Sequence, residues 1–164
     1  MVKANVMGPE ATLQALSEDS RLLAALANPK RLEIVHILAE GKLRPTQIYE
    51  MLDLPQANSS QHLKVLRDAG IILAEQHGRE RYYRLANPRL KDLVKLIRHI
   101  TVGGDALPES QPLVELLPIT TDPVCGMRIS VPLSGFLADH AGKTYHFCAS
   151  GCLKKFETNP EKYL

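Results

Sequence analysis

The sequence of 164 residues contains no tryptophan, few aromatic residues (5%) and only three cysteines. It has no apolar run of the about 18 to 20 residues that a membrane-spanning helix needs. The first residues, MVKANVMGPEATLQ, lack the apolar core of a secretory signal. A hydrophobic content of 45% excludes a disordered chain, and the length allows at most two modest domains. We therefore predict a folded cytoplasmic protein that does not contact a membrane.

The three cysteines are informative because Cys125, Cys148 and Cys152 all lie in the last quarter of the chain. An odd number of cysteines in a reducing compartment argues against a disulfide framework and favours metal-ligand or thiol chemistry. The sequence also lacks a Ser/His/Asp set, paired catalytic carboxylates and a phosphate-binding loop. These absences predict that the protein is not an enzyme and has no small-molecule substrate.

Charge and proline content divide the chain into unlike parts. Residues 1–102 hold 15 Lys and Arg against 11 Asp and Glu, whereas residues 103–164 hold 5 against 7. A segment beginning with two glycines and containing several prolines separates these parts, which is typical of a linker. The predicted organisation is a first domain over 10–102, a linker over 103–121 and a second domain over 122–164.

The first domain has the helical periodicity and the turn signals of a DNA-binding fold. Two short helices joined by a tight turn and followed by a basic hairpin are typical of a winged helix-turn-helix. We predict a helix ending at Asn28, a helix from Pro29 to about Gly41, short helices over 45–52 and 56–69, strands over 71–75 and 81–85, and a final helix from Asn87 to Ile100. The fold class is therefore mainly α with a β-wing.

The final predicted helix has apolar residues on more than one side. Its apolar surface is therefore larger than a small domain can bury. Exposed apolar surface of this kind is typical of subunit interfaces. Together with the first helix, this surface predicts a homodimer.

Three motifs carry a resemblance to a known family. LANPKRLEI at 26–34, SSQHLKVLRDAGII at 59–72 and GRERYYRL at 78–85 stand in the order and spacing of the ArsR/SmtB family. Residues 20–100 therefore resemble the winged-helix repressors of that family. The resemblance implies a homodimeric transcriptional repressor that binds double-stranded operator DNA.

Polar and basic side chains of this domain are predicted to contact DNA. Short donors and acceptors at the start of the second helix of the motif suit base edges in the major groove, namely those of Gln56, Asn58, Ser59 and Gln61. Cationic side chains in that helix and in the wing suit phosphates, namely those of Lys64, Arg79 and Arg81. Helix capping and solvated surface positions are the alternative for these residues, and His62 is predicted to be structural.

The second domain is predicted to bring its cysteines to one place. Cys148 and Cys152 stand at i and i+4, so both sulfurs project from one face of a helix. Cys125 precedes Gly126 and suits a tight turn. Predicted strands over 135–139 and 143–147 join the two ends, which gives a small α+β metal-binding plan.

The elements DPVCGM, YHFC and FETNPEKY make residues 122–163 similar to a YHS domain, a treble-clef-like group that includes the TRASH domains. This resemblance implies heavy-metal binding through Cys125, Cys148 and Cys152. Three thiolates favour Cu(I) and, by extension, Ag(I), Hg(II) or As(III), whereas Zn(II) needs a fourth ligand, for which His146, His140 or water are candidates.

The first domain has no cysteine and lacks the thiolate pair that metal sensors of its family often carry. We therefore expect metal sensing in the second domain, with release of DNA when the metal binds and coupling through residues 103–121 onto the last helix. Thiol or persulfide sensing by Cys148 and Cys152 is an alternative. A metal chaperone or an enzyme accessory part is another.

Overall fold

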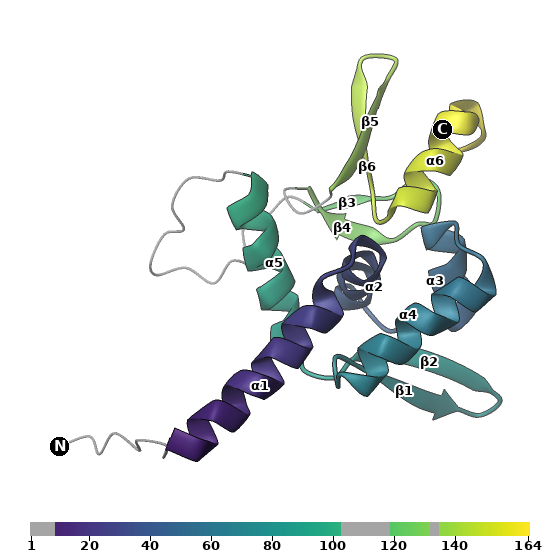
Figure 1. Cartoon of the computed structure of the whole chain (residues 1–164). Coiled ribbons are helices and arrows are strands. Elements are labelled where there is room, and N and C mark those ends of the chain that lie inside the picture. Colours follow the sequence, from purple (N-terminus) through teal and green to yellow (C-terminus); the bar gives the residue numbers. More distant parts are fainter. Residues whose placement is uncertain (1–8, 103–118, 132–134) are drawn as a thin grey trace.

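The computed structural model describes residues 9–102, 119–131 and 135–164, and Figure 1 shows their arrangement. The first part of the chain forms α1 (Pro9–Leu26), α2 (Pro29–Ala39), α3 (Pro45–Leu52), α4 (Gln56–Asp68), β1 (Ile72–His77), β2 (Glu80–Leu85) and α5 (Arg89–Val102). The order of these elements confirms the winged helix-turn-helix prediction. None of the described helices is long and apolar enough to cross a membrane.

Proline and capping residues set the boundaries of the helices. The side chain of Asn28 accepts hydrogen bonds from the backbone N–H groups of Lys30 (3.1 Å) and Arg31 (3.2 Å), which begins α2. Helix α3 begins at Pro45 and ends at Asp53, whose φ of 50° is left-handed. This left-handed residue redirects the chain toward α4 and produces the turn of the motif.

The wing is fixed to the helices by backbone pairing. β1 and β2 form an antiparallel hairpin, with Gly78 at φ 63° in its turn. Leu43, before α3, exchanges two hydrogen bonds with Tyr83 of β2, at 3.0 and 2.8 Å. The wing and the helix-turn-helix motif therefore keep one relative orientation.

The second part of the chain contains two small hairpins and one helix. Its elements are β3 (Ile119–Thr121), β4 (Arg128–Ser130), β5 (Phe136–His140), β6 (Lys143–Phe147), α6 (Ser150–Thr158) and the 3-10 helix η2 (Pro160–Lys162). Phe156 of α6 packs against Tyr145 and Phe147 of β6, with ring centroids 5.1 and 5.0 Å apart. This aromatic cluster fixes α6 on the β5–β6 hairpin.

The predicted boundary before the second domain needs a correction. Residues 103–118 of the expected linker lie outside the described residues, but Ile119–Thr121 pair with β4 in an antiparallel hairpin. A three-residue strand is too short to give a clear alternating pattern, which is why the sequence placed it in the linker.

The two parts share one apolar core. The buried cluster runs from Ile34 and Ile37 of α2, through Ile48 of α3, to Phe147 and Phe156. Such continuity differs from two domains that are joined only by a flexible linker. A displacement of one part therefore pushes directly on packed side chains of the other part.

Candidate metal centre and DNA-binding surface

The structure brings the three cysteines of the second part together. The sulfurs of Cys125, Cys148 and Cys152 and a carboxylate oxygen of Asp122 all lie within 4.8 Å of one another. The sulfur of Cys148 lies 3.5 Å from that of Cys125 and 3.7 Å from that of Cys152. Cys125 lies between β3 and β4, Cys148 follows β6, and Cys152 lies in the first turn of α6. The set of donors is compact and combines three soft sulfurs with one hard carboxylate oxygen.

Asp122 connects the two cysteine-bearing segments. One oxygen of this fully buried carboxylate accepts hydrogen bonds from the backbone N–H of Val124 (2.8 Å) and of Cys125 (3.4 Å). The other oxygen accepts one from the backbone N–H of Cys148, at 2.8 Å. The positions of Cys125 and Cys148 thus depend on one side chain. Sequence reasoning missed this residue, although an Asp before a short turn is the usual signal of an Asx turn.

In the metal-free cluster, Cys125 is the cysteine that is deprotonated, and the other two remain thiols. Hydrogen bonds from the thiols of Cys148 and Cys152 lower the pKa of Cys125 to about 3. The same hydrogen bonding to Cys125 raises the pKa values of Cys148 and Cys152 above the usual range, and burial adds to both. Binding a cation to all three thiolates therefore releases the protons of Cys148 and Cys152.

The histidines considered as a fourth ligand are not part of this cluster. His146 lies on β6 opposite Leu137 and is not among the grouped donors. The ring of His140 packs edge-on against Phe156, and its Nε2 lies 3.4 Å from a carboxylate oxygen of Glu161. The donor next to the three sulfurs is instead Asp122, because the loop before Cys125 turns its carboxylate inward.

The residues predicted to contact DNA occupy α4 and the wing. Most of them have exposed side chains: Gln56, Asn58, Gln61, Lys64, Arg79 and Arg81. A hollow of about 450 Å³ between α4 and the wing is lined by Gln56, Lys64, Arg67 and Arg81, among others. This places the groups that are predicted to read bases and to bind phosphates on one surface, together with Arg67, which the sequence did not single out.

Ser59 is the exception and corrects the prediction. Its side chain is fully buried, and its hydroxyl has no hydrogen-bond partner in the described part of the chain. Leu63, one turn further along α4, is also buried, so Ser59 belongs to the inward face of the helix. The hydroxyl is therefore not placed for a base contact.

Comparisons with known proteins agree with both halves. Residues 28–73 match the family described as bacterial regulatory protein, arsR family, and residues 120–164 match the YHS domain. The HTH-type transcriptional repressor SmtB of Mycobacterium tuberculosis is 42% identical over 100 residues, or 60% of this chain and 70% of that protein. The chain belongs to the ArsR family. This family consists of DNA-binding transcriptional regulators, which are not enzymes.

Two further relatives place the ArsR domain among known proteins. The probable mercury resistance operon repressor of Streptomyces lividans is 33% identical over 87 residues, or 53% of this chain and 70% of that protein. The solution structure of the homodimeric winged helix-turn-helix domain of Mb0332 from Mycobacterium bovis has a TM-score of 0.53 and 26% identity. The structural match covers 66% of this chain and 99% of the Mb0332 domain.

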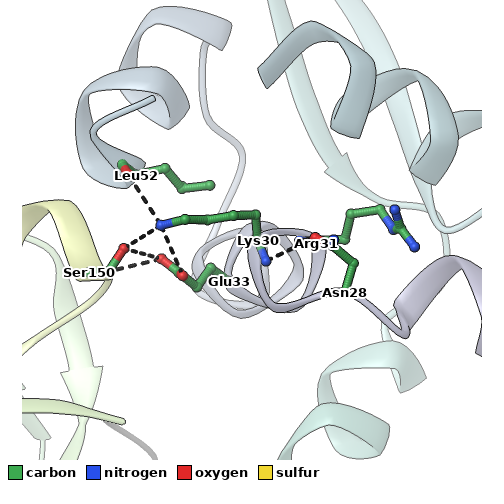
Figure 2. A network of polar contacts seen from close by, with 6 residues as sticks. All are labelled: Asn28, Lys30, Arg31, Glu33, Leu52 and Ser150. Atoms are coloured by element: carbon green, nitrogen blue, oxygen red, sulfur yellow. Dashed lines mark hydrogen bonds and ion pairs between the residues drawn. The ribbon is translucent and has the colours of Figure 1, made fainter. Parts of the chain in front are cut away.

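The YHS domain contacts the ArsR domain through the residues between Cys148 and Cys152. Figure 2 shows Lys30 of α2 donating to the hydroxyl of Ser150 (2.6 Å) and to the carbonyl of Leu52 (3.4 Å). The backbone N–H and hydroxyl of Ser150 donate to the buried carboxylate of Glu33, at 3.2 and 2.7 Å. Lys30 and Glu33 also form an ion pair at 3.2 Å. A buried polar network of this kind fixes one geometry.

Gly151 lies directly on the turn of the helix-turn-helix motif. A Cβ atom at this position would overlap the backbone at Met51 and Asp53, so no larger residue fits without a shift. Further along α6, Lys154 pairs with Asp53, and the ammonium of Lys155 donates to the carbonyl of Glu50 at 2.8 Å. The end of α3 is therefore held by the YHS helix.

Iodoacetamide is expected to modify Cys125 first in the metal-free protein, because Cys125 is exposed and carries the thiolate, whereas Cys148 and Cys152 are buried. Its alkylation rate should change less than about twofold between pH 5 and pH 8. The rate of an ordinary cysteine falls about tenfold per unit below its pKa. Peptide mass spectrometry after timed quenching measures both rates, with Cys125→Ser as control. A tenfold fall per pH unit at Cys125 would contradict the shared thiolate.

Arg79→Ala and Arg81→Ala are each expected to weaken binding to duplex DNA. Each variant should reduce the slope of log K against log salt concentration by about 0.9 per bound protomer, because each protomer loses one phosphate contact and its released counterion. Fluorescence anisotropy at several salt concentrations measures the slope. Lys143→Ala, which removes an exposed charge from the β5–β6 turn, should leave it unchanged. Equal slopes in all four proteins would rule out phosphate contacts by the wing.

Proposed function

We propose that this protein is a metal-responsive transcriptional repressor. It binds double-stranded operator DNA as a homodimer and is released when a soft metal ion binds Cys125, Cys148 and Cys152. One observation carries the proposal: the three sulfurs lie together, and the residues between two of them pack on the helix-turn-helix motif. A probable mercury resistance repressor among the relatives supports a metal signal.

The donor set favours Cu(I) or As(III) over Zn(II). Three thiolates suit soft ions, and Cys125, Cys148 and Cys152 provide them without moving another group. Zn(II) prefers four ligands, and the fourth donor here is Asp122. Both oxygens of Asp122 already accept backbone hydrogen bonds, so ligation by this carboxylate competes with its structural role. When bound, the ion supplies a positive centre that holds three thiolates together.

The path from the cysteines to DNA leads through the domain contact. Cys148 and Cys152 bracket Ser150 and Gly151, which contact α2 and the end of α3. Loss of protons from both thiols changes the charge and the spacing of the sulfurs, so this contact is strained or rearranged. Helix α4 follows α3 after the Asp53 turn, and a shift of α3 changes how α4 meets the major groove. Coupling through residues 103–121 onto the last helix stays a prediction.

Homodimerisation has support in the apolar surface. Large exposed apolar side chains gather on α1 (Leu13, Leu16 and Leu23) and on α5 (Leu96 and Ile100). Figure 1 shows α1 extending from the body of the protein, with one end left uncovered. A second copy would cover both helices. The winged helix-turn-helix domain of Mb0332, which is homodimeric, supports dimerisation.

Thiol sensing is the second candidate function. The exposed thiolate of Cys125 lies 3.5 Å from the sulfur of Cys148, which favours a bond between these two over the Cys148–Cys152 bond that the sequence suggests. Peroxide would accept the two electrons and be reduced to water as the disulfide forms. Mass spectrometry separates the functions, since oxidation removes two hydrogens and a chelator does not reverse it.

Addition of Cu(I) or As(III) to the anaerobically purified protein is expected to weaken operator binding at least about tenfold, which is a coupling of ordinary size. The operator is first selected from random duplexes by the metal-free protein, and anisotropy at fixed salt measures affinity. Cys148→Ser should bind the operator normally and not respond, and a chelator should restore the wild type. Unchanged affinity with each of Cu(I), As(III) and Zn(II) would overturn metal regulation.

Gly151→Ala is expected to separate metal binding from DNA release. The added methyl group displaces α6 from the turn at Met51 and Asp53, so the metal Kd should stay within about threefold while the response of operator affinity shrinks at least about fivefold. Titration of metal and of operator on the same preparation gives both values. Glu157→Gln, an exposed change on α6, serves as control. A full response in Gly151→Ala would exclude this route.

A further inference from the structure

A cavity of about 360 Å³ lies between α2, α5 and the YHS domain, away from the DNA-binding surface and beside the metal centre, whose Cys148 forms part of its wall. Its size is that of a pocket for a small organic ligand. Most of its wall is apolar and comes from both domains, including Leu32, Ile37, Val94, Ile97, Ile129 and Phe136. We propose that this cavity binds a small organic carboxylate with an apolar body.

Two cationic side chains line the cavity and form no ion pair with a described residue, although the carboxylates of Glu40 and Asp92 act on Lys95 from a greater distance. Lys95 is only 6% exposed, and no hydrogen bond or ion pair to it occurs among the described residues. The Nε atom of Arg98 is buried and also has no partner in the described part of the chain. Lys95 and Arg98 stand at i and i+3 on α5, so they face the same space. An unpaired buried cation is costly, and a bound anion removes that cost.

The acidic groups that line the cavity are already engaged. Glu33 pairs with Lys30 at 3.2 Å and accepts two hydrogen bonds from Ser150. Glu40 pairs with Lys91 at 3.7 Å. The remaining titratable ring is that of His36, whose pKa falls to about 4 because of burial and the nearby Arg98. His36 is therefore neutral at pH 7, and the cavity has excess positive charge.

Gly135 has no side chain, and the guanidinium group of Arg98 occupies the space that a Cβ atom at this position would fill. A Cβ atom at Gly135 would overlap the guanidinium, so this glycine lets the charge reach the edge of the YHS domain. A carboxylate that spans Arg98 and Lys95 places its apolar body against Ile129 and Phe136. The apolar wall disfavours a small, strongly hydrated anion such as phosphate, since its remaining oxygens would lose water without gaining donors. The ligand therefore needs both an anionic head and an apolar body.

Isothermal titration of the full metal-free chain with octanoate and benzoate tests the site independently of the metal hypothesis. At least one carboxylate is expected to bind, and 1-octanol and inorganic phosphate are expected to bind at least about tenfold more weakly, because each lacks one half of the recognition. The proposal is overturned if neither carboxylate binds at millimolar concentration. It is also overturned if phosphate or 1-octanol binds as well as the carboxylates.

Substitutions locate the binding. Lys95→Met and Arg98→Met are each expected to weaken carboxylate binding at least about tenfold, whereas Arg89→Met, an exposed change on the same helix, should alter it less than about twofold. Both pocket variants should keep or raise the melting temperature of the ligand-free protein, since each removes an unpaired charge. Wild-type affinity in both folded pocket variants would place the ligand elsewhere and refute the proposal.

Discussion

The buried carboxylate of Asp122 is the interaction on which the functional half of this protein depends. It accepts backbone hydrogen bonds from Val124, Cys125 and Cys148, and so joins a turn after β3 to the end of β6. Burial raises the pKa of this carboxyl group, and the Cys125 thiolate adds to the effect. Three converging N–H groups compensate for the loss of water. The same hydrogen bonds tie the backbone of Cys125 to that of Cys148.

The placement of Cys148 has consequences beyond the YHS domain. Ser150 and Gly151 lie between Cys148 and Cys152, and their contacts with Glu33 and with the end of α3 join the candidate sensor to the DNA-binding motif. A closely packed interior has low compressibility and does not deform gradually. A change in the spacing of the sulfurs therefore has to move this turn or break its hydrogen bonds. The same docking encloses the cavity beside α5, so metal and carboxylate would both act at the contact between the domains.

Several features were readable from the sequence because their causes are local. Asn28 before Pro29 marks the start of a helix, and Gly78 between two β-prone runs marks the wing. The spacing of Cys148 and Cys152 placed both sulfurs on one helical face. Errors arose where partners are distant: Ser59 looked like a base contact, because the core that buries it comes from other elements. His146 looked closer to the sulfurs than Asp122, because only folding turns that carboxylate inward.

Local sequence patterns are sufficient to identify the family, the winged helix-turn-helix, the basic and acidic halves of the chain and the three cysteines of one cluster. These follow from periodicity, turn residues and spacing, which act over a few residues. The packing of the YHS domain on α2 and α3 is apparent only once the chain is folded. The same holds for the cavity that Lys95 and Arg98 line without an ion pair to any described residue. Burial and charge compensation depend on which surfaces meet, and segments more than a hundred residues apart, such as Lys30 and Ser150, supply those surfaces.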